Sequence, residues 1–125
     1  MKRILIIEDD NDILEVIKTI LSMNDYDVIA INSTDDIIES VRQHDPTLVL
    51  TDYLLPGMNG GKICQLIKKT QETCHIPVVL MSAYQELAIA IGNFGFDAFI
   101  HKPFNINHLV KTVNNCVSVR AANSA

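Results

Sequence analysis

The amino-acid sequence predicts an α/β fold, an open three-layer sandwich in which helices cover both faces of a parallel five-stranded sheet. Five short apolar segments alternate with longer segments in which apolar residues recur at helical spacing, which gives the order strand–helix five times over. The short segments are almost continuously apolar, as strands buried on both faces of a parallel sheet are. With 125 residues, 48% of them hydrophobic, the chain can form one core of ordinary domain size.

The expected strands consist mainly of aliphatic and β-branched residues and are three or four residues long. They are residues 4–7 (ILII), 28–31 (VIAI), 48–51 (LVLT), 78–81 (VVLM) and 98–100 (AFI). Short connections with right-handed crossovers place these strands side by side in one open sheet.

The segments between the strands carry apolar stripes that indicate amphipathic helices. The stripes are Ile13, Leu14, Ile17, Ile20 and Leu21; then Ile37, Ile38 and Val41; then Ile63, Leu66 and Ile67; and finally Leu109, Val110, Val113 and Val117. Residues that cap helix N-termini precede three of the helices. Ser33 and Asp36 form a capping-box pattern, and Asn59 and Asn105 can each cap the helix that follows.

Composition and charge argue against several classes of function. Ten basic against fifteen acidic residues leave a net charge of −5, which disfavours binding to nucleic acid or to an anionic membrane. No apolar run approaches the roughly 20 residues of a membrane span, and the three cysteines lack the spacing of a disulfide framework or a zinc site. We therefore expect a cytoplasmic protein, with one domain over residues 1–119 and a frayed tail over residues 120–125.

Polar residues follow four of the expected strands at their carboxyl ends, the edge at which ligands bind in sheets of this kind. They are Glu8, Asp9 and Asp10 after the first strand, Asp52 after the third, Ser82 after the fourth, and His101 and Lys102 after the fifth. If Glu8, Asp9 and Asp52 converge, three carboxylates face one ammonium group, and the excess negative charge requires raised pKa values or a bound cation. Oxygen ligands in a partly open site favour Mg²⁺, with Mn²⁺ as a substitute.

Each of these residues also has a purely structural interpretation. Glu8, Asp9 and Asp10 could merely cap the first helix and complement its dipole. Asp52 could belong to the turn that follows it, and Lys102 could be a solvated loop lysine. Ser82 alone carries almost no information. The functional interpretation depends on four separate strands placing compatible groups at one edge. The four histidines lack a metal-ligand spacing, and no glycine-rich nucleotide-binding loop is present.

Four segments together resemble the receiver domain of two-component response regulators. They are residues 4–10 (ILIIEDD), 51–60 (TDYLLPGMNG), 81–83 (MSA) and 99–104 (FIHKPF), in the order and with the spacing of that family. The resemblance covers residues 2–117. It implies a flavodoxin-like (βα)5 fold with strand order 2-1-3-4-5, and a cis peptide bond between Lys102 and Pro103.

The resemblance further implies that Asp52 accepts a phosphoryl group. Glu8, Asp9 and Asp52, with the main-chain carbonyl of Leu54, would hold Mg²⁺, which screens the carboxylate from the incoming phosphoryl group. Lys102 would supply a second positive centre. Carboxylate attack gives a mixed anhydride, which is energetic enough to shift a conformational equilibrium.

A conformational switch is expected from Ser82 and Phe99. Ser82 would bind the phosphoryl group by moving toward it. Phe99 lies at the aromatic switch position of the family, where it replaces the more common tyrosine. Gly61, in the first turn of the third helix, departs from the family pattern, and the sequence offers no reason for it.

These residues lead to one functional hypothesis and to weaker alternatives. The chain is expected to take a phosphoryl group from a sensor histidine kinase or a phosphotransfer protein onto Asp52, and to signal through an unknown output protein or a phosphorylation-dependent homodimer. A phosphohydrolase of the haloacid-dehalogenase type would need a second acid where this sequence has Leu54. Carboxylates in the pocket would repel the phosphate of a flavin cofactor, and a receiver that signals without phosphate is disfavoured because the acceptor residues are all present.

The output surface is expected on the fourth helix, the fifth strand and the fifth helix. Residues 87–96 read LAIAIGNFGF and carry no charge, although an outer helix should have a polar face. If Leu87, Ile91 and Phe94 face the sheet, Ile89 lies roughly opposite them at about 100° per residue and is exposed. The alternative is a short, deeply packed helix whose remaining apolar atoms are ordinary surface.

Overall fold

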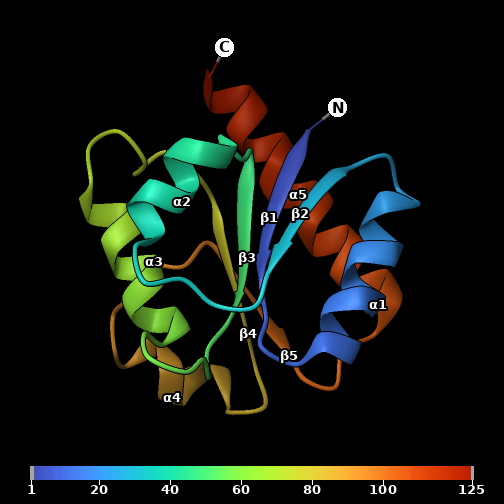
Figure 1. Ribbon diagram of the computed structural model, residues 1–125, viewed down its shortest axis with the longest axis horizontal. Coiled ribbons are helices and arrows are strands. Elements are labelled where there is room, and N and C mark those ends of the chain that lie inside the picture. The colour runs from blue at the N-terminus through green and yellow to red at the C-terminus, as the bar shows by residue number, and fades with distance from the viewer. Residues whose placement is uncertain (1, 125) are drawn as a thin grey trace.

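Five parallel strands form the centre of the computed structural model, which describes the backbone of residues 2–124 and the side chains of residues 2–118 (Figure 1). The strands are β1 (Arg3–Ile7), β2 (Asp27–Ile31), β3 (Leu48–Asp52), β4 (Val78–Ser82) and β5 (Ala98–His101). They pair in the order β2-β1-β3-β4-β5, and each pairing is parallel. The predicted α/β fold and its strand order are thus confirmed.

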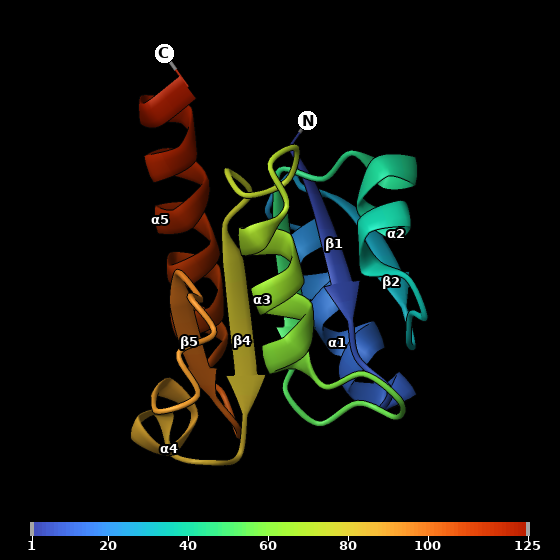
Figure 2. The same ribbon diagram turned by 90° about the vertical axis from the view of Figure 1, so that its left-hand side faces the viewer.

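Helices cover both faces of this sheet (Figures 1 and 2). They are α1 (Asn11–Ser22), α2 (Ile37–His44), α3 (Gly60–Lys69), α4 (Glu86–Ala90) and α5 (Ile106–Ser124). The helices α1 and α5 lie on one face and α2 and α3 on the other, while the short α4 lies beside the carboxyl ends of β4 and β5 (Figure 2). The three layers agree with the predicted sandwich.

The nearly continuous apolar character of the strands follows from burial on both faces. In β1, Ile4 and Ile6 belong to the core cluster that includes α1 and α5, whereas Leu5 and Ile7 belong to the cluster that includes α2 and α3. All four side chains are fully buried. Burial of an aliphatic side chain contributes about 1.5–3 kcal/mol relative to exposure, so these short strands hold the two outer layers together.

Polar side chains cap α1, α3 and α5 where these helices begin. Asp10 accepts hydrogen bonds from the backbone N–H groups of the first turn of α1. Asn59 accepts from the N–H of Lys62 at 2.8 Å and so caps α3. Asn105 caps α5 in the same way, with the N–H of Asn107 at 2.8 Å. The predicted caps at Asn59 and Asn105 are confirmed, and each satisfies an N–H group that has no partner within its helix.

The predicted capping box at Ser33 is wrong. The helix α2 begins at Ile37, and its N-cap is Asp36, whose carboxylate accepts from the N–H of Glu39 at 3.1 Å. An N-cap directly precedes the first helical residue, so Ser33 would require a helix from Thr34 onward. That segment is not helical, and Asp36 alone serves the first turn of α2.

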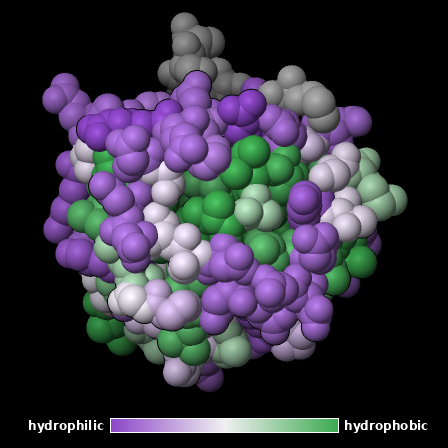
Figure 3. All heavy atoms as spheres, in the orientation of Figure 1, coloured by the Kyte–Doolittle hydropathy of each residue, from purple (hydrophilic) through white to green (hydrophobic). Residues whose placement is uncertain are grey.

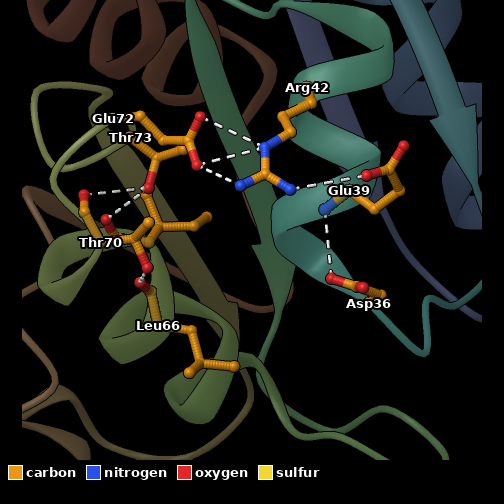
Figure 4. Close-up of polar contacts among 8 residues, drawn as sticks. Asp36, Glu39, Arg42, Leu66, Thr70, Glu72 and Thr73 are labelled. Atoms are coloured by element: carbon orange, nitrogen blue, oxygen red, sulfur yellow. Dashed lines mark hydrogen bonds and ion pairs between the residues drawn. The ribbon is translucent and has the colours of Figure 1, made fainter.

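A polar contact joins α2 to the loop that follows α3 (Figure 4). Arg42 on α2 forms an ion pair and hydrogen bonds with Glu72, and both side chains are about half exposed. Beside them Thr73 is only 2% exposed, and its hydroxyl donates to the carbonyl of Ile67 at 2.8 Å. This bond satisfies a carbonyl in the last turn of α3, where the helix itself supplies no partner.

The helix α4 ends before it reaches Phe94, and its exposed face is not the one that the sequence analysis expected. Ile89 is buried, with 3% exposure, whereas Leu87 and Ile91 are 73% and 78% exposed. The prediction of an exposed Ile89 is therefore wrong. It assumed that Phe94 continues the helix, but α4 ends at Ala90 and the chain then turns, so Phe94 does not fix the helix orientation.

The sheet has an open edge at β2. All five residues of β2 are half-buried, and Figure 3 shows apolar side chains gathered along the middle of this side of the molecule, with hydrophilic residues around them. In this strand Ile29 and Ile31 pack against the core cluster of α2 and α3. The edge strand therefore keeps its apolar character although helices cover it only in part.

The two ends of the described chain lie at the same edge of the sheet. The start of β1 and the end of α5 lie together opposite α4 (Figures 1 and 2). Because α5 extends to Ser124, it passes the expected domain boundary at residue 119; that boundary and the fraying of residues 120–125 stay predictions, and residue 125 lies outside the described residues. Within the described residues, no helix has the length and apolar character that crossing a membrane requires.

Candidate functional site

Three carboxylates meet at the carboxyl ends of β1 and β3. Glu8 and Asp9 directly follow β1, and Asp52 is the last residue of β3. Because these strands are neighbours and parallel, their ends share one edge of the sheet. One oxygen from each of the three side chains lies within 4.8 Å of the others. Glu8 and Asp52 are buried and Asp9 is exposed, so the cluster opens to solvent on one side.

Lys102 brings the end of β5 into the same cluster. Its Nζ lies 2.8 Å from Oε2 of Glu8 and 3.2 Å from Oδ1 of Asp52. The backbone N–H of Lys102 donates to the carbonyl of Ser82 at 2.8 Å, which fixes the loop after β5 to the end of β4. The Lys102–Pro103 bond is cis, as the resemblance implied.

Burial and like charge shift the pKa values of this cluster. Burial raises the pKa of Glu8 above its usual range, although the hydrogen bond from Lys102 opposes the shift. The pKa of Asp52 is likewise raised by burial, and the Asp9 charge adds to the shift while Lys102 opposes it. Burial alone lowers the pKa of the Lys102 ammonium, but its contacts with Glu8 and Asp52 outweigh burial and raise it. The contacts with Lys102 therefore offset only part of the cost of burying these two carboxylates.

Ser82 and Phe99 lie on the neighbouring strands β4 and β5, and their role as a switch stays a prediction. Ser82 ends β4, is 2% exposed, and its Oγ accepts a hydrogen bond from the N–H of Tyr84 at 2.9 Å. Phe99 lies half-buried on β5, and its ring centroid is 6.0 Å from that of Phe96. Leu54 follows Asp52 in the loop after β3, with a largely exposed side chain.

The donor set suits a hard divalent cation. Within the described residues, the group of acidic, histidine or cysteine side chains arranged to hold a metal is Glu8, Asp9 and Asp52. All its ligand atoms are carboxylate oxygens, which Mg²⁺ prefers. Three carboxylates and one ammonium leave an excess of negative charge, which a cation would offset.

The comparison with known families decides what this arrangement belongs to. The family model described as "Response regulator receiver domain" matches residues 4–114, a range that contains Glu8, Asp9, Asp52, Ser82 and Lys102. The chain belongs to the response regulator receiver domain family. It is therefore a signalling phosphoacceptor domain of two-component systems, and its acidic cluster is typical of the magnesium site of receiver domains.

Individual relatives agree with this assignment. The receiver domain is 32% identical over 114 residues to the DNA-binding response regulator MtrA of Mycolicibacterium paratuberculosis, covering 90% of this chain and 49% of that protein. It is 31% identical over 119 residues to the histidine kinase P4 of Formosa agariphila, covering 94% of this chain and 9% of that protein. The chain thus spans about half or less of the length of these curated relatives.

Solved structures show the same fold. The signal receiver domain of a histidine kinase from Syntrophus aciditrophicus has a TM-score of 0.82 at 28% identity, covering 94% of this chain and 91% of that chain. The response regulator TrrA from Thermotoga maritima, solved in complex with Mg²⁺ and BeF, has a TM-score of 0.82 at 24% identity, covering 93% and 99%.

Two features of the receiver domain near Asp52 escaped the sequence analysis. Gly60 begins α3, and a Cβ at this position would lie 2.1 Å from the carbonyl oxygen of Asp52. The N–H of Gly60 also donates to the carbonyl of Tyr53 at 2.8 Å, so the loop after β3 closes tightly on itself. The second feature is an aromatic group in which the Tyr53 ring contacts those of Tyr84 and Phe94. For the close approach of Gly60 to Asp52, the sequence offers one signal, which is the glycine at the start of a helix.

Proposed function

We propose that this receiver domain accepts a phosphoryl group on Asp52 from a sensor histidine kinase or a phosphotransfer protein, and that it signals by contact with another protein. The observation that carries the proposal is the cluster itself: the carboxylate of Asp52 lies buried beside Glu8 and Asp9, with Lys102 at 3.2 Å. A buried carboxylate at the carboxyl end of a strand, next to an opening to solvent, can act as a nucleophile toward phosphorus.

In the proposed transfer, an oxygen of Asp52 attacks the phosphorus of the donor phosphohistidine. The new bond joins that oxygen to phosphorus, while the bond from phosphorus to the imidazole nitrogen breaks and its electron pair stays on the nitrogen. Lys102 places its ammonium beside the oxygens that gain charge. The Ser82 hydroxyl can donate to a phosphoryl oxygen after a small movement toward Asp52.

For the metal, we propose that Glu8, Asp9 and Asp52, together with the main-chain carbonyl of Leu54, hold Mg²⁺. The bound cation supplies positive charge that lowers the repulsion between the carboxylates and a phosphoryl group. Glu8 already accepts from Lys102 and from the N–H of Asp10, so its oxygens are fixed in place.

A cavity beside Lys102 suits the phosphodonor protein. It has a volume of about 510 Å³ and opens between α1 and the loop after β5. It is lined by Ile13, Val16, Ala83, Lys102, Pro103, Phe104 and Ile106. Val16 and Ile106 are 50% and 56% exposed. An apolar side chain of a donor helix could fill this cavity and bring a phosphohistidine next to Asp52.

For the output, we propose α4 and its neighbours β5 and α5 as the contact surface. Leu87 and Ile91 are exposed on or beside α4, and Tyr84 precedes it with 52% exposure. Because α4 follows Ser82 closely, a movement of Ser82 can reposition it. An output protein or a phosphorylation-dependent homodimer would use the same surface. A cytoplasmic location, where two-component kinases phosphorylate their partners, belongs to the same proposal.

Phosphorylation by a small donor tests the central proposal. The protein is incubated with acetyl phosphate and Mg²⁺, and its intact mass is measured. We expect one added phosphoryl group in the natural sequence, none in Asp52→Asn, and none when a chelator removes Mg²⁺. An Asp52→Asn variant that still gains the full phosphoryl group would show that another residue is the acceptor.

A further inference from the structure

The segment between α4 and β5 is attached to α3 through the side chain and carbonyl of Phe94. Asn93 and Gly95, on either side of Phe94, have positive φ angles of 54° and 84°, so the chain bends sharply around it. The Phe94 carbonyl accepts a hydrogen bond from Sγ of Cys64 on α3, at 3.3 Å. The side chain is half-buried and packs against the core cluster of α2 and α3.

Two glycines provide the space that the Phe94 ring occupies. A Cβ at Gly61 in α3 would lie 2.6 Å from Cε2 of Phe94, and a Cβ at Gly92 would lie 2.4 Å from its Cζ. Both distances are too short for non-bonded carbon atoms. Glycine is among the least favourable residues within a helix, so the unexplained Gly61 has a physical reason: any side chain there would displace the ring.

The ring is also connected to both segments that carry the phosphorylation site. Tyr53 directly follows Asp52, and its ring centroid lies 6.1 Å from that of Phe94. The Tyr53 ring makes a T-shaped contact with Tyr84, also at 6.1 Å. The backbone N–H of Tyr84 in turn donates to Oγ of Ser82 at 2.9 Å. One side chain therefore links the α4–β5 segment to the ends of β3 and β4.

We propose that Phe94, docked between Gly61 and Gly92, is a conformational latch that holds the α4–β5 segment in the arrangement of the unphosphorylated protein. The inference rests on the proposed phosphorylation of Asp52 and adds a regulatory element to it. The latch connects the acceptor site with the surface proposed for output.

The direction of coupling follows from the contacts. Because Oγ of Ser82 is bonded to the N–H of Tyr84, a movement of Ser82 toward a phosphoryl group carries Tyr84 with it. This disturbs the contact of Tyr84 with Tyr53, and with it the packing of Tyr53 on Phe94. Docking of the ring and occupation of the site oppose each other. By linkage, any change that undocks the ring strengthens binding of a phosphoryl mimic.

Two substitutions undock the ring in different ways. Gly61→Ala places a methyl group where the ring lies, and Phe94→Ala removes the ring. Calorimetric titration of the full chain with beryllofluoride and Mg²⁺ should give a dissociation constant about fivefold lower for each variant than for the natural sequence. The double variant should bind no more tightly than Phe94→Ala alone. Met23→Ala, a control that removes an exposed apolar side chain at the end of α1, should bind as the natural sequence does.

Thermal unfolding tests the geometry independently. Gly61→Ala should lower Tm when Phe94 is present, and should raise it in the Phe94→Ala background, where only the better helix propensity of alanine remains. If either variant fails to fold, as judged by circular dichroism, Phe94→Leu replaces it in the titration.

The outcomes separate the latch from the proposed function. If the natural sequence binds no beryllofluoride, the proposed function is wrong. If it binds, but Gly61→Ala and Phe94→Ala bind with an unchanged or higher dissociation constant, then the ring only contributes to packing and the latch is wrong. A lower dissociation constant in both, together with the reversed effect on Tm, supports the latch.

Discussion

At the scale of single residues, the charge balance of the site depends on Lys102. Its ammonium contacts both Glu8 and Asp52, whose own pKa values are raised mainly by burial. The single ammonium group of Lys102 is therefore shared between two desolvated carboxylates, and Asp9 adds a third negative charge on the side that is open to solvent. A site of this kind is electrostatically unfavourable when empty, and this favours the binding of a cation or the loss of a carboxylate.

The raised pKa of Asp52 gives a prediction about stability and pH. In the unfolded chain Asp52 releases its proton with the ordinary carboxyl pKa of 3.8, whereas in the folded protein its pKa is higher. The folded state then binds more protons, so stability falls as pH rises through this window. Without metal, Asp52→Asn should therefore be more stable than the natural sequence at pH 7, and the difference should shrink toward pH 4.

Urea unfolding in the presence of a chelator, at pH 4 and at pH 7, measures this difference. The sign is the informative result. If the natural sequence were the more stable of the two at pH 7, the contacts of Asp52 with Lys102 would outweigh its desolvation, and the interpretation of the site as electrostatically strained would be wrong.

At the scale of elements, helix caps could be predicted from the sequence better than contacts between segments that are distant along the chain. The caps at Asn59 and Asn105 were predicted, because a cap depends only on its neighbours in the chain. The sequence favours a capping box of Ser33 and Asp36 at the start of α2, whereas Asp36 is itself the N-cap. Serine and aspartate are both common N-cap residues, so the sequence does not separate the two positions. The role of Gly60 was missed, because its contact with the Asp52 carbonyl exists only once the loop after β3 has folded back.

The contact between α2 and the end of α3 gives a prediction at this scale (Figure 4). The Thr73 hydroxyl is buried and donates to the carbonyl of Ile67, so Thr73→Val leaves that carbonyl without this partner and should cost about 1–3 kcal/mol. Arg42 and Glu72 are about half exposed, and solvent screens exposed ion pairs strongly. Arg42→Ala should therefore cost much less than Thr73→Val.

Chemical denaturation of the two variants side by side tests this ranking. The substitutions affect the same junction, so each serves as the control of the other. A larger loss of stability for Arg42→Ala would mean that the surface ion pair between α2 and the loop after α3 stabilises the protein more than the buried hydroxyl at the end of α3 does.

At the scale of the whole molecule, the layer order and the convergence of the site could both be predicted, because parallel strands bring their carboxyl ends to one edge. Glu8, Asp9, Asp52 and Lys102 meet there as expected. The face presented by α4 could not be predicted. Its orientation depends on where the helix ends and on Phe94 finding space beside Gly61, and both are properties of the folded chain.

The corrected orientation of α4 gives a prediction about association. Ile91 is 78% exposed and Ile89 is buried, so Ile91→Glu should leave Tm nearly unchanged. It should weaken any phosphorylation-dependent dimer or partner complex, and a loss of about 1.4 kcal/mol raises the dissociation constant tenfold. Ile89→Glu should instead unfold or strongly destabilise the domain, because it buries a charge. Light scattering at several concentrations, with and without beryllofluoride, measures the dimer. Unchanged association in Ile91→Glu would place the output surface elsewhere.

The strands all run in one direction, with a practical consequence for handling this domain. The start of β1 and the end of α5 lie opposite the edge that carries Asp52 and α4 (Figures 1 and 2). A linker attached at either end would leave the molecule on its far side. A fluorescent label, an affinity tag or an immobilising surface could therefore be joined there without covering the side that carries Asp52 and α4.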